Sequence, residues 1–130
     1  VGLTAANMQG AVGVTQDVDL WFKDVEHPGI KRALRAVGGT FVPSTAFTPP
    51  MFAGKHVQLF DIVVTMHGLD DFAAELKNTI ELTISRYKVK VLSVEGISHS
   101  KTGLNREKDR LVLRMLKDAS VAVKEAKKKR

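Results

Sequence analysis

Two stretches of the chain have the apolar pattern of β-strands. Residues 15–22 place Val18, Leu20 and Phe22 at every second position, which is the period of a half-buried strand. Residues 56–65 are apolar at most positions, as in a central strand that is covered on both faces. The pattern therefore predicts two strong strands in the first half of the chain.

Other stretches predict a hairpin, a long connection and several helices. Residues 80–84 and 88–92 alternate apolar and polar side chains around a short link, which is typical of a β-hairpin. Residues 40–55 contain three prolines and predict an extended connection with a short edge strand at Phe41–Val42, packed down by Phe47, Met51 and Phe52. Apolar spacing and capping residues predict helices over residues 3–9, 28–37, 70–77, 93–103 and 105–119, with Asp70, Ser93 and Asn105 as N-caps.

The order of these elements is helix, strand, helix, strand, helix, hairpin and two helices. It predicts a mixed α/β or α+β domain with one mixed sheet of about four to five strands and flanking helices. A chain of 130 residues is expected to form one domain. We assign residues 1–119 to that domain and residues 120–130 to a basic helix end or tail.

Charge is concentrated at the C-terminus. The net charge is +6, and five cations lie among the last seven residues with only one acid between them. Such a tail binds nucleic acid by releasing counterions, or it is a solvated helix end. The chain has no cysteine, which excludes disulfides and thiolate metal sites, and it has no apolar run of membrane-spanning length. We expect a cytoplasmic protein without a membrane partner.

Three acidic residues interrupt the two strong strands. Asp17 and Asp19 are two positions apart, so a strand would place both carboxylates on one face. This pairing is unfavourable unless a cation such as Mg²⁺ or Mn²⁺ lies between them or both point into water. Asp61 lies within the apolar stretch 56–65, where burial is costly unless the carboxylate is paired, binds metal or faces an exposed edge.

Four segments together resemble a known enzyme superfamily. They are GLTAANMQG at residues 2–10, TQDVDLWF at 15–22, VLSVEGISHSK at 91–101 and REKD at 106–109. They are similar to the DNA polymerase β-like nucleotidyltransferases, and to the small branch related to the AbiEii-type toxins of bacterial toxin–antitoxin systems. The resemblance covers residues 2 to about 118.

The resemblance implies a metal centre. Asp17, Asp19 and Asp61, from two neighbouring strands, would hold divalent Mg²⁺ or Mn²⁺ ions. The ions would activate an attacking hydroxyl and neutralise the leaving pyrophosphate of a nucleoside triphosphate. A nucleoside monophosphate would be transferred to a hydroxyl on an unknown acceptor, which is a protein, an RNA or a small molecule.

The resemblance also implies a triphosphate site. The backbone amides of Gly2, Leu3 and Thr4 would hold phosphates at the start of a helix. Lys101 would contact the triphosphate as a point charge, and Asp109 would orient Lys101 or the nucleotide. The family's turn has a second small residue beside the glycine, which Gly2 lacks. A non-catalytic module that binds nucleotide or a cognate partner protein therefore remains an open alternative.

Overall fold

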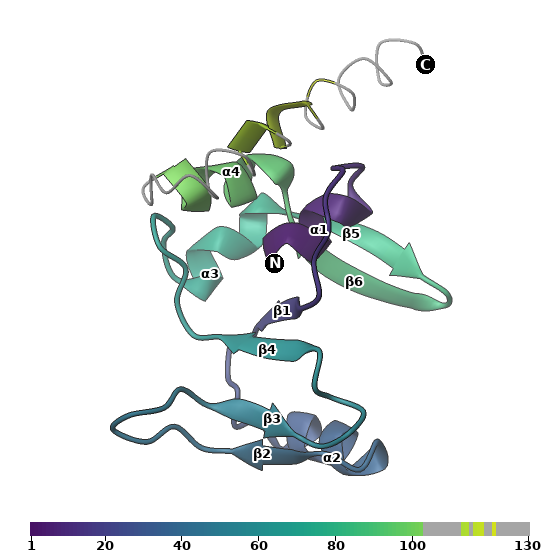
Figure 1. The fold of residues 1–130 in the computed structure, drawn as a ribbon, viewed down its shortest axis with the longest axis vertical. Coiled ribbons are helices and arrows are strands. Elements are labelled where there is room, and N and C mark those ends of the chain that lie inside the picture. Colours follow the sequence, from purple (N-terminus) through teal and green to yellow (C-terminus); the bar gives the residue numbers. More distant parts are fainter. Residues whose placement is uncertain (103–112, 115, 119–120, 122–130) are drawn as a thin grey trace. The chain divides into compact units, whose positions relative to one another are not determined.

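The computed structural model describes residues 1–102, 113–114, 116–118 and 121. Its helices and short strands confirm the mixed α+β class (Figure 1). The chain divides into two compact units, and each is described by itself. The first unit combines Val1–Thr15 with Thr65–Arg130, and the second is Gln16–Val64.

In the part of the first unit that the structure describes, the chain forms helices and one hairpin. Its elements are α1 (Gly2–Met8), α3 (Phe72–Glu75), the 3₁₀ turn η1 (Leu76–Asn78), β5 (Thr79–Ile84), β6 (Tyr87–Leu92) and α4 (Val94–Thr102). The antiparallel pairing of β5 with β6 confirms the predicted hairpin, with Ile84 opposite Tyr87. The link is therefore only Ser85–Arg86, and Ser85 takes a positive φ of 57° to close the turn.

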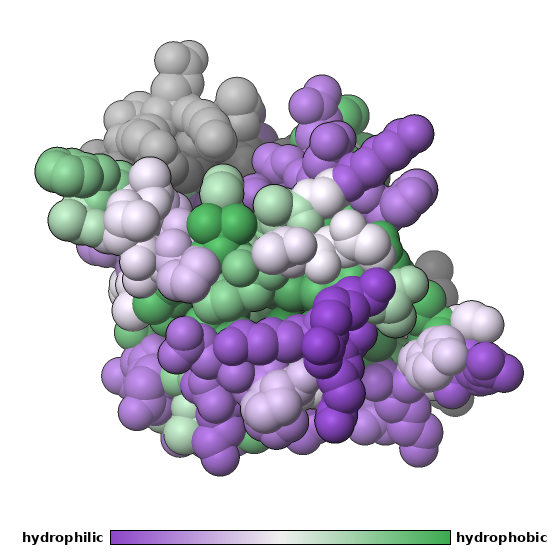
Figure 2. Space-filling model, turned by 90° about the horizontal axis from the view of Figure 1, so that it is seen from below, coloured by the Kyte–Doolittle hydropathy of each residue, from purple (hydrophilic) through white to green (hydrophobic). Residues whose placement is uncertain are grey.

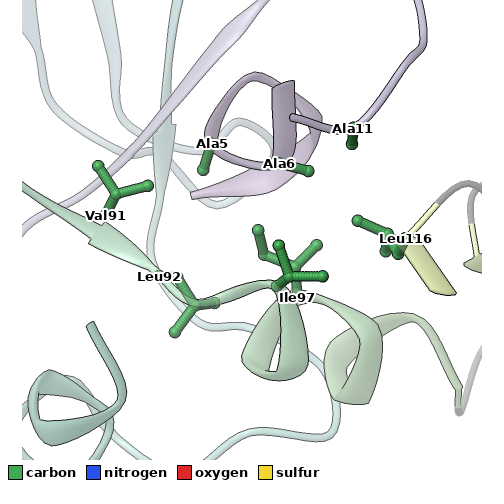
Figure 3. Packing of buried hydrophobic residues seen from close by; sticks show 8 residues of the cluster. Ala5, Ala6, Ala11, Val91, Leu92, Ile97 and Leu116 are labelled. Atoms are coloured by element: carbon green, nitrogen blue, oxygen red, sulfur yellow. The ribbon is translucent and has the colours of Figure 1, made fainter. Parts of the chain in front are cut away.

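Small apolar side chains of α1 pack against β6 and α4 in the core of this unit. Figure 3 shows Ile97 of α4 pointing toward α1, which presents Ala5 and Ala6. Small side chains on α1 allow this close approach. The buried apolar cluster consists of Ala5, Ala6, Ala11, Val91, Leu92, Val94, Ile97 and Leu116. Gln9 ties α1 to β6, since its Nε2 donates to the carbonyl oxygen of Leu92 at 2.8 Å.

Helix caps in the first unit agree with the sequence at one position and differ at another. The Oγ of Ser93 accepts a hydrogen bond from the Gly96 amide at 3.2 Å, which confirms the predicted cap of α4. The predicted cap at Asp70 is wrong by one residue, because Asp71 has the extended backbone and accepts from the Ala74 amide at 2.9 Å. In the predicted helix 105–119, residues 113, 114 and 116–118 are helical, whereas its cap Asn105 lies outside the described residues.

The second unit contains four short strands and one helix. They are β1 (Val18–Trp21), α2 (Pro28–Ala36), β2 (Thr40–Val42), β3 (Met51–Ala53) and β4 (Phe60–Val63). Pro28 opens α2 and Gly38, with φ of +74°, follows its end, which confirms the helix predicted over residues 28–37. His27 caps the helix by accepting from the Gly29 amide at 3.0 Å.

The strands that the structure describes form three two-stranded ladders and not the single sheet of four to five strands that the sequence predicts. β1 pairs in parallel with β4, while β2–β3 and β5–β6 are antiparallel. One reason is local, since residues 56–59 form turns in place of the expected strand. The Val57 amide donates to the Gly54 carbonyl at 3.2 Å, and the Phe60 amide donates to the Val57 carbonyl at 3.1 Å.

The aromatic residues of the proline-rich connection differ in how far they are buried. Phe52 packs edge-to-face against Phe22 and Phe41, with ring centroids 5.9 Å and 6.5 Å apart. Phe47 is 96% exposed and Met51 is 51% exposed, so their predicted packing is wrong. Phe47 lies in a tight turn in which its amide donates to the Thr45 hydroxyl at 3.2 Å. Met51 lies on the exposed face of β3, opposite to the face that carries Phe52.

Candidate metal and nucleotide site

Two of the three candidate carboxylates are neighbours across the parallel ladder. Asp19 of β1 is the register partner of Asp61 of β4. Partner residues in a parallel ladder project to the same face, and adjacent strands lie about 4.8 Å apart. Asp19 is half-buried and Asp61 is exposed. The two like charges therefore come from two neighbouring strands, and solvent reaches the pair at Asp61.

Asp17 lies outside the strand that was expected to carry it. β1 begins at Val18, after a bend at Gln16, so strand geometry does not place Asp17 beside Asp19. The shorter strand has a direct cause, since β4 begins only at Phe60 and its partner is Val18. The side chain of Asp17 is exposed. A part for Asp17 in a shared metal site stays a prediction.

Two carboxylates in register fit a hard divalent cation. Mg²⁺ is commonly bound through one or two carboxylates together with substrate phosphates and water. Within the described part of the chain, no group of three His, Asp or Glu side chains is arranged to hold a metal ion. The arrangement thus fits a cation held by Asp19 and Asp61 whose remaining ligands come from solvent or from a bound phosphate.

The candidate phosphate-binding segment opens α1 in the first unit. Gly2 is buried and has a φ of +73°, a conformation that glycine adopts readily. Leu3 and Thr4 follow in the first turn and are half-buried. Among the described residues, no side chain caps this helix start.

Lys101 lies on α4, which packs against α1 in the same unit. Its side chain is half-buried in the last turn of the helix. The loop at Gly68 passes close to this turn, since a Cβ on Gly68 would lie 3.2 Å from the carbonyl oxygen of His99. The loop therefore supports the end of α4 that carries Lys101. Asp109 lies outside the described residues.

The structure distributes the candidate residues between its two units. The second unit holds Asp17, Asp19 and Asp61, whereas the first holds Gly2–Thr4 and Lys101. Within each unit the candidates lie on elements that contact each other: β1 with β4, and α1 with α4.

Sequence reasoning missed a groove in the second unit. It has a volume of about 430 Å³ and lies between α2 and β2. Two of its lining residues, Lys31 and Arg35, are one helical turn apart on α2. That spacing of four residues was the available signal, because it places both cations on one helix face.

No family model, curated protein or solved structure matches the chain. Among the helices that the structure describes, none is both long enough and apolar enough to cross a membrane.

Proposed function

We propose that this chain is a metal-dependent nucleotidyltransferase that moves a nucleoside monophosphate from a nucleoside triphosphate to a hydroxyl of a protein, an RNA or a small molecule. The observation that supports the proposal most strongly is the register of Asp19 against Asp61 on adjacent parallel strands. Two carboxylates in register on adjacent strands supply the kind of oxygen ligands that Mg²⁺ prefers.

In this proposal Asp19 and Asp61 hold Mg²⁺ or Mn²⁺. A bound divalent ion supplies charge stabilisation for phosphoryl oxygens and lowers the pKa of an attacking hydroxyl. The contribution of the chain is to fix two oxygen ligands on neighbouring strands. Strands hold such ligands more rigidly than loops do.

The first unit would bind the triphosphate. The amides of Gly2, Leu3 and Thr4 would donate to phosphate oxygens, and Lys101 would add a positive charge. Asp109 would orient Lys101 or the nucleotide. The packing of α1 against α4 supports a shared role for these groups, because it joins the helix start and the lysine-bearing helix in one core.

The biological setting follows from the resemblance to AbiEii-type toxins. We propose a cytoplasmic enzyme of a toxin–antitoxin pair, with the cognate antitoxin as its partner protein. The alternative is a non-catalytic module that keeps nucleotide or partner binding. The half-present turn at Gly2–Leu3 favours this second candidate.

Mn²⁺ binding tests the cation site without requiring turnover. Electron paramagnetic resonance of free Mn²⁺, titrated with protein, is expected to give saturable binding to the wild type and at least about tenfold weaker binding to Asp19→Asn and Asp61→Asn. Asp24→Asn is the matched control. It removes an exposed carboxylate of the same unit but retains the oxygen that accepts from the Glu26 amide at 3.0 Å. Equal Mn²⁺ affinity in all four proteins would exclude the site.

Turnover then separates the two candidate functions. The enzyme is expected to label an acceptor from a radiolabelled nucleoside triphosphate in the presence of Mg²⁺, and Asp19→Asn is expected to abolish the labelling. Nucleotide and Mn²⁺ binding without release of pyrophosphate, in the presence of cell extract as acceptor source, would identify the non-catalytic module instead.

A further inference from the structure

The groove between α2 and β2 joins a cationic wall to an apolar floor. Lys31 and Arg35 come from the helix, while the floor includes Leu34, Phe41 and Pro43. One acid, Glu26, also lines it. Two cations above an apolar surface suit a ligand that has both phosphate groups and flat rings. Figure 2 shows strongly hydrophilic side chains beside apolar ones on the face it presents.

The positive charge of the second unit is concentrated on α2. Gln16–Val64 contains five Lys and Arg residues and five Asp and Glu residues, yet three of the cations and none of the acids lie on this helix. Among the residues that the structure describes, neither Lys31 nor Arg35 forms an ion pair. Both cations are therefore available to an anionic ligand.

Packing within the second unit sets the shape of the groove. The Nζ of Lys31 lies 5.9 Å from the centroid of the Phe41 ring, within the range of a cation–π contact. Gly39 is buried in the floor, where an added Cβ would meet the Leu34 side chain at 3.2 Å. A lysine in contact with an aromatic ring and a closely packed floor lower the entropy lost on binding.

We propose that this groove binds a single-stranded nucleic acid segment. Its phosphates would be held by Lys31 and Arg35, and one base with its sugar would lie on the floor of Leu34, Phe41 and Pro43. This binding does not depend on the proposed nucleotide transfer. If the transfer also holds, the groove is a candidate place for a nucleic acid acceptor.

Matched charge reversals on one helix test the proposal. Binding of a fluorescein-labelled oligouridylate is measured by polarisation for the full chain and for Lys31→Glu, Arg35→Glu and Arg32→Glu. Arg32 is exposed on the same helix but is not among the residues that line the groove. Each of the first two variants is expected to bind at least about tenfold more weakly, while Arg32→Glu changes affinity less than about threefold.

Salt dependence and crosslinking add independent readouts. Each groove variant is expected to lower the slope of log affinity against log salt concentration by about 0.7, which corresponds to one lost phosphate contact on a single strand. Photocrosslinking of 4-thiouridine in the same oligonucleotide is expected to label the peptide that contains Phe41. Circular dichroism of each variant checks that it remains folded.

Three results would overturn the proposal. Equal weakening by all three reversals would indicate binding to diffuse charge, and no weakening by any of them would place the binding on the basic C-terminal segment. Competition by polyglutamate at equal charge concentration, as strong as that by unlabelled oligouridylate, would identify the groove as a site for acidic peptides.

Discussion

Asp19 lies directly opposite Asp61 in the parallel pairing of β1 with β4. Without a divalent cation, removal of one charge should relieve the repulsion, and Asp61→Asn is expected to raise the free energy of unfolding by roughly 0.2–1 kcal/mol. Urea unfolding in EDTA, followed by circular dichroism, measures this change. Asp24→Asn, in the same unit and outside the ladder, is expected to leave the midpoint unchanged.

In saturating Mg²⁺, the wild type should instead be more stable to unfolding than Asp61→Asn. A cation that binds only the folded wild type adds stability through mass action, whereas Asp61→Asn loses that gain. The wild type is then expected to unfold at a higher urea concentration than the variant. A variant that stays more stable than the wild type in both buffers contradicts cation binding by this pair.

Gly68 combines a left-handed backbone with a close contact to α4. Gly68→Ala is expected to destabilise the protein by about 1–3 kcal/mol, because alanine is strained at a φ of +76° and its Cβ would lie 3.2 Å from the His99 carbonyl oxygen. Gly38→Ala is the matched control, since Gly38 has a φ of +74° and no atom of the described residues lies within 4 Å of the added Cβ. Thermal unfolding of both variants isolates the contact, and equal losses would show that α4 adjusts freely.

The aromatic residues of the proline-rich connection should differ sharply in their effect on stability. Phe52→Ala removes a ring that packs against Phe22 and Phe41, and it is expected to cost about 2–3 kcal/mol. Phe47→Ala truncates a side chain that is 96% exposed and should change stability by less than about 0.5 kcal/mol. Urea midpoints of both variants decide the matter, and a large loss from Phe47→Ala would mean that the ring packs in solution.

The basic C-terminal segment gives a prediction from sequence alone. Removal of Lys127–Arg130 takes away four cations, so nucleic acid binding at low salt should weaken and its salt slope should fall by up to about 2.8. The measurement is polarisation of a labelled oligonucleotide over a salt series. Replacement of the four residues by serine removes the same charge but keeps the chain length, so it separates the effect of charge from that of length. An unchanged salt slope in both variants would exclude binding by the tail.

Local features of the fold were predictable because their causes are local. Alternation of apolar residues predicted the β5–β6 hairpin, and the sequence also predicted Ser93 as the cap of α4. The sequence did not show whether Asp70 or Asp71 caps α3. Both residues have the chemistry of an N-cap, and the backbone conformation decides between them: Asp71 has a ψ of 170° and lies just outside the helix.

Long-range features were harder to predict for a physical reason. The pairing of β2 with β3 depends on contacts across the proline-rich loop, and Met51 gave no strand signal of its own. The resemblance implied that the acidic strands are neighbours, but the pairing of Asp19 with Asp61 also depends on where β4 begins. The turns over residues 56–59 set that start at Phe60 and thereby leave Asp17 outside the ladder.

Glu75 is a buried carboxylate with a structural explanation. Its Oε1 accepts from the Asp70 amide at 3.1 Å, and its Oε2 accepts from Nδ2 of Asn78 at 3.0 Å. Glu75→Gln would turn one acceptor into a donor that faces another donor, so we expect a loss of about 1–3 kcal/mol in the free energy of unfolding. Glu95→Gln, at an exposed position in the first turn of α4, is the matched control, with a change below about 0.5 kcal/mol. Chemical unfolding of both variants makes the comparison. Equal stability of the two proteins would mean that the loop at Asp70 and the turn at Asn78 do not depend on this carboxylate.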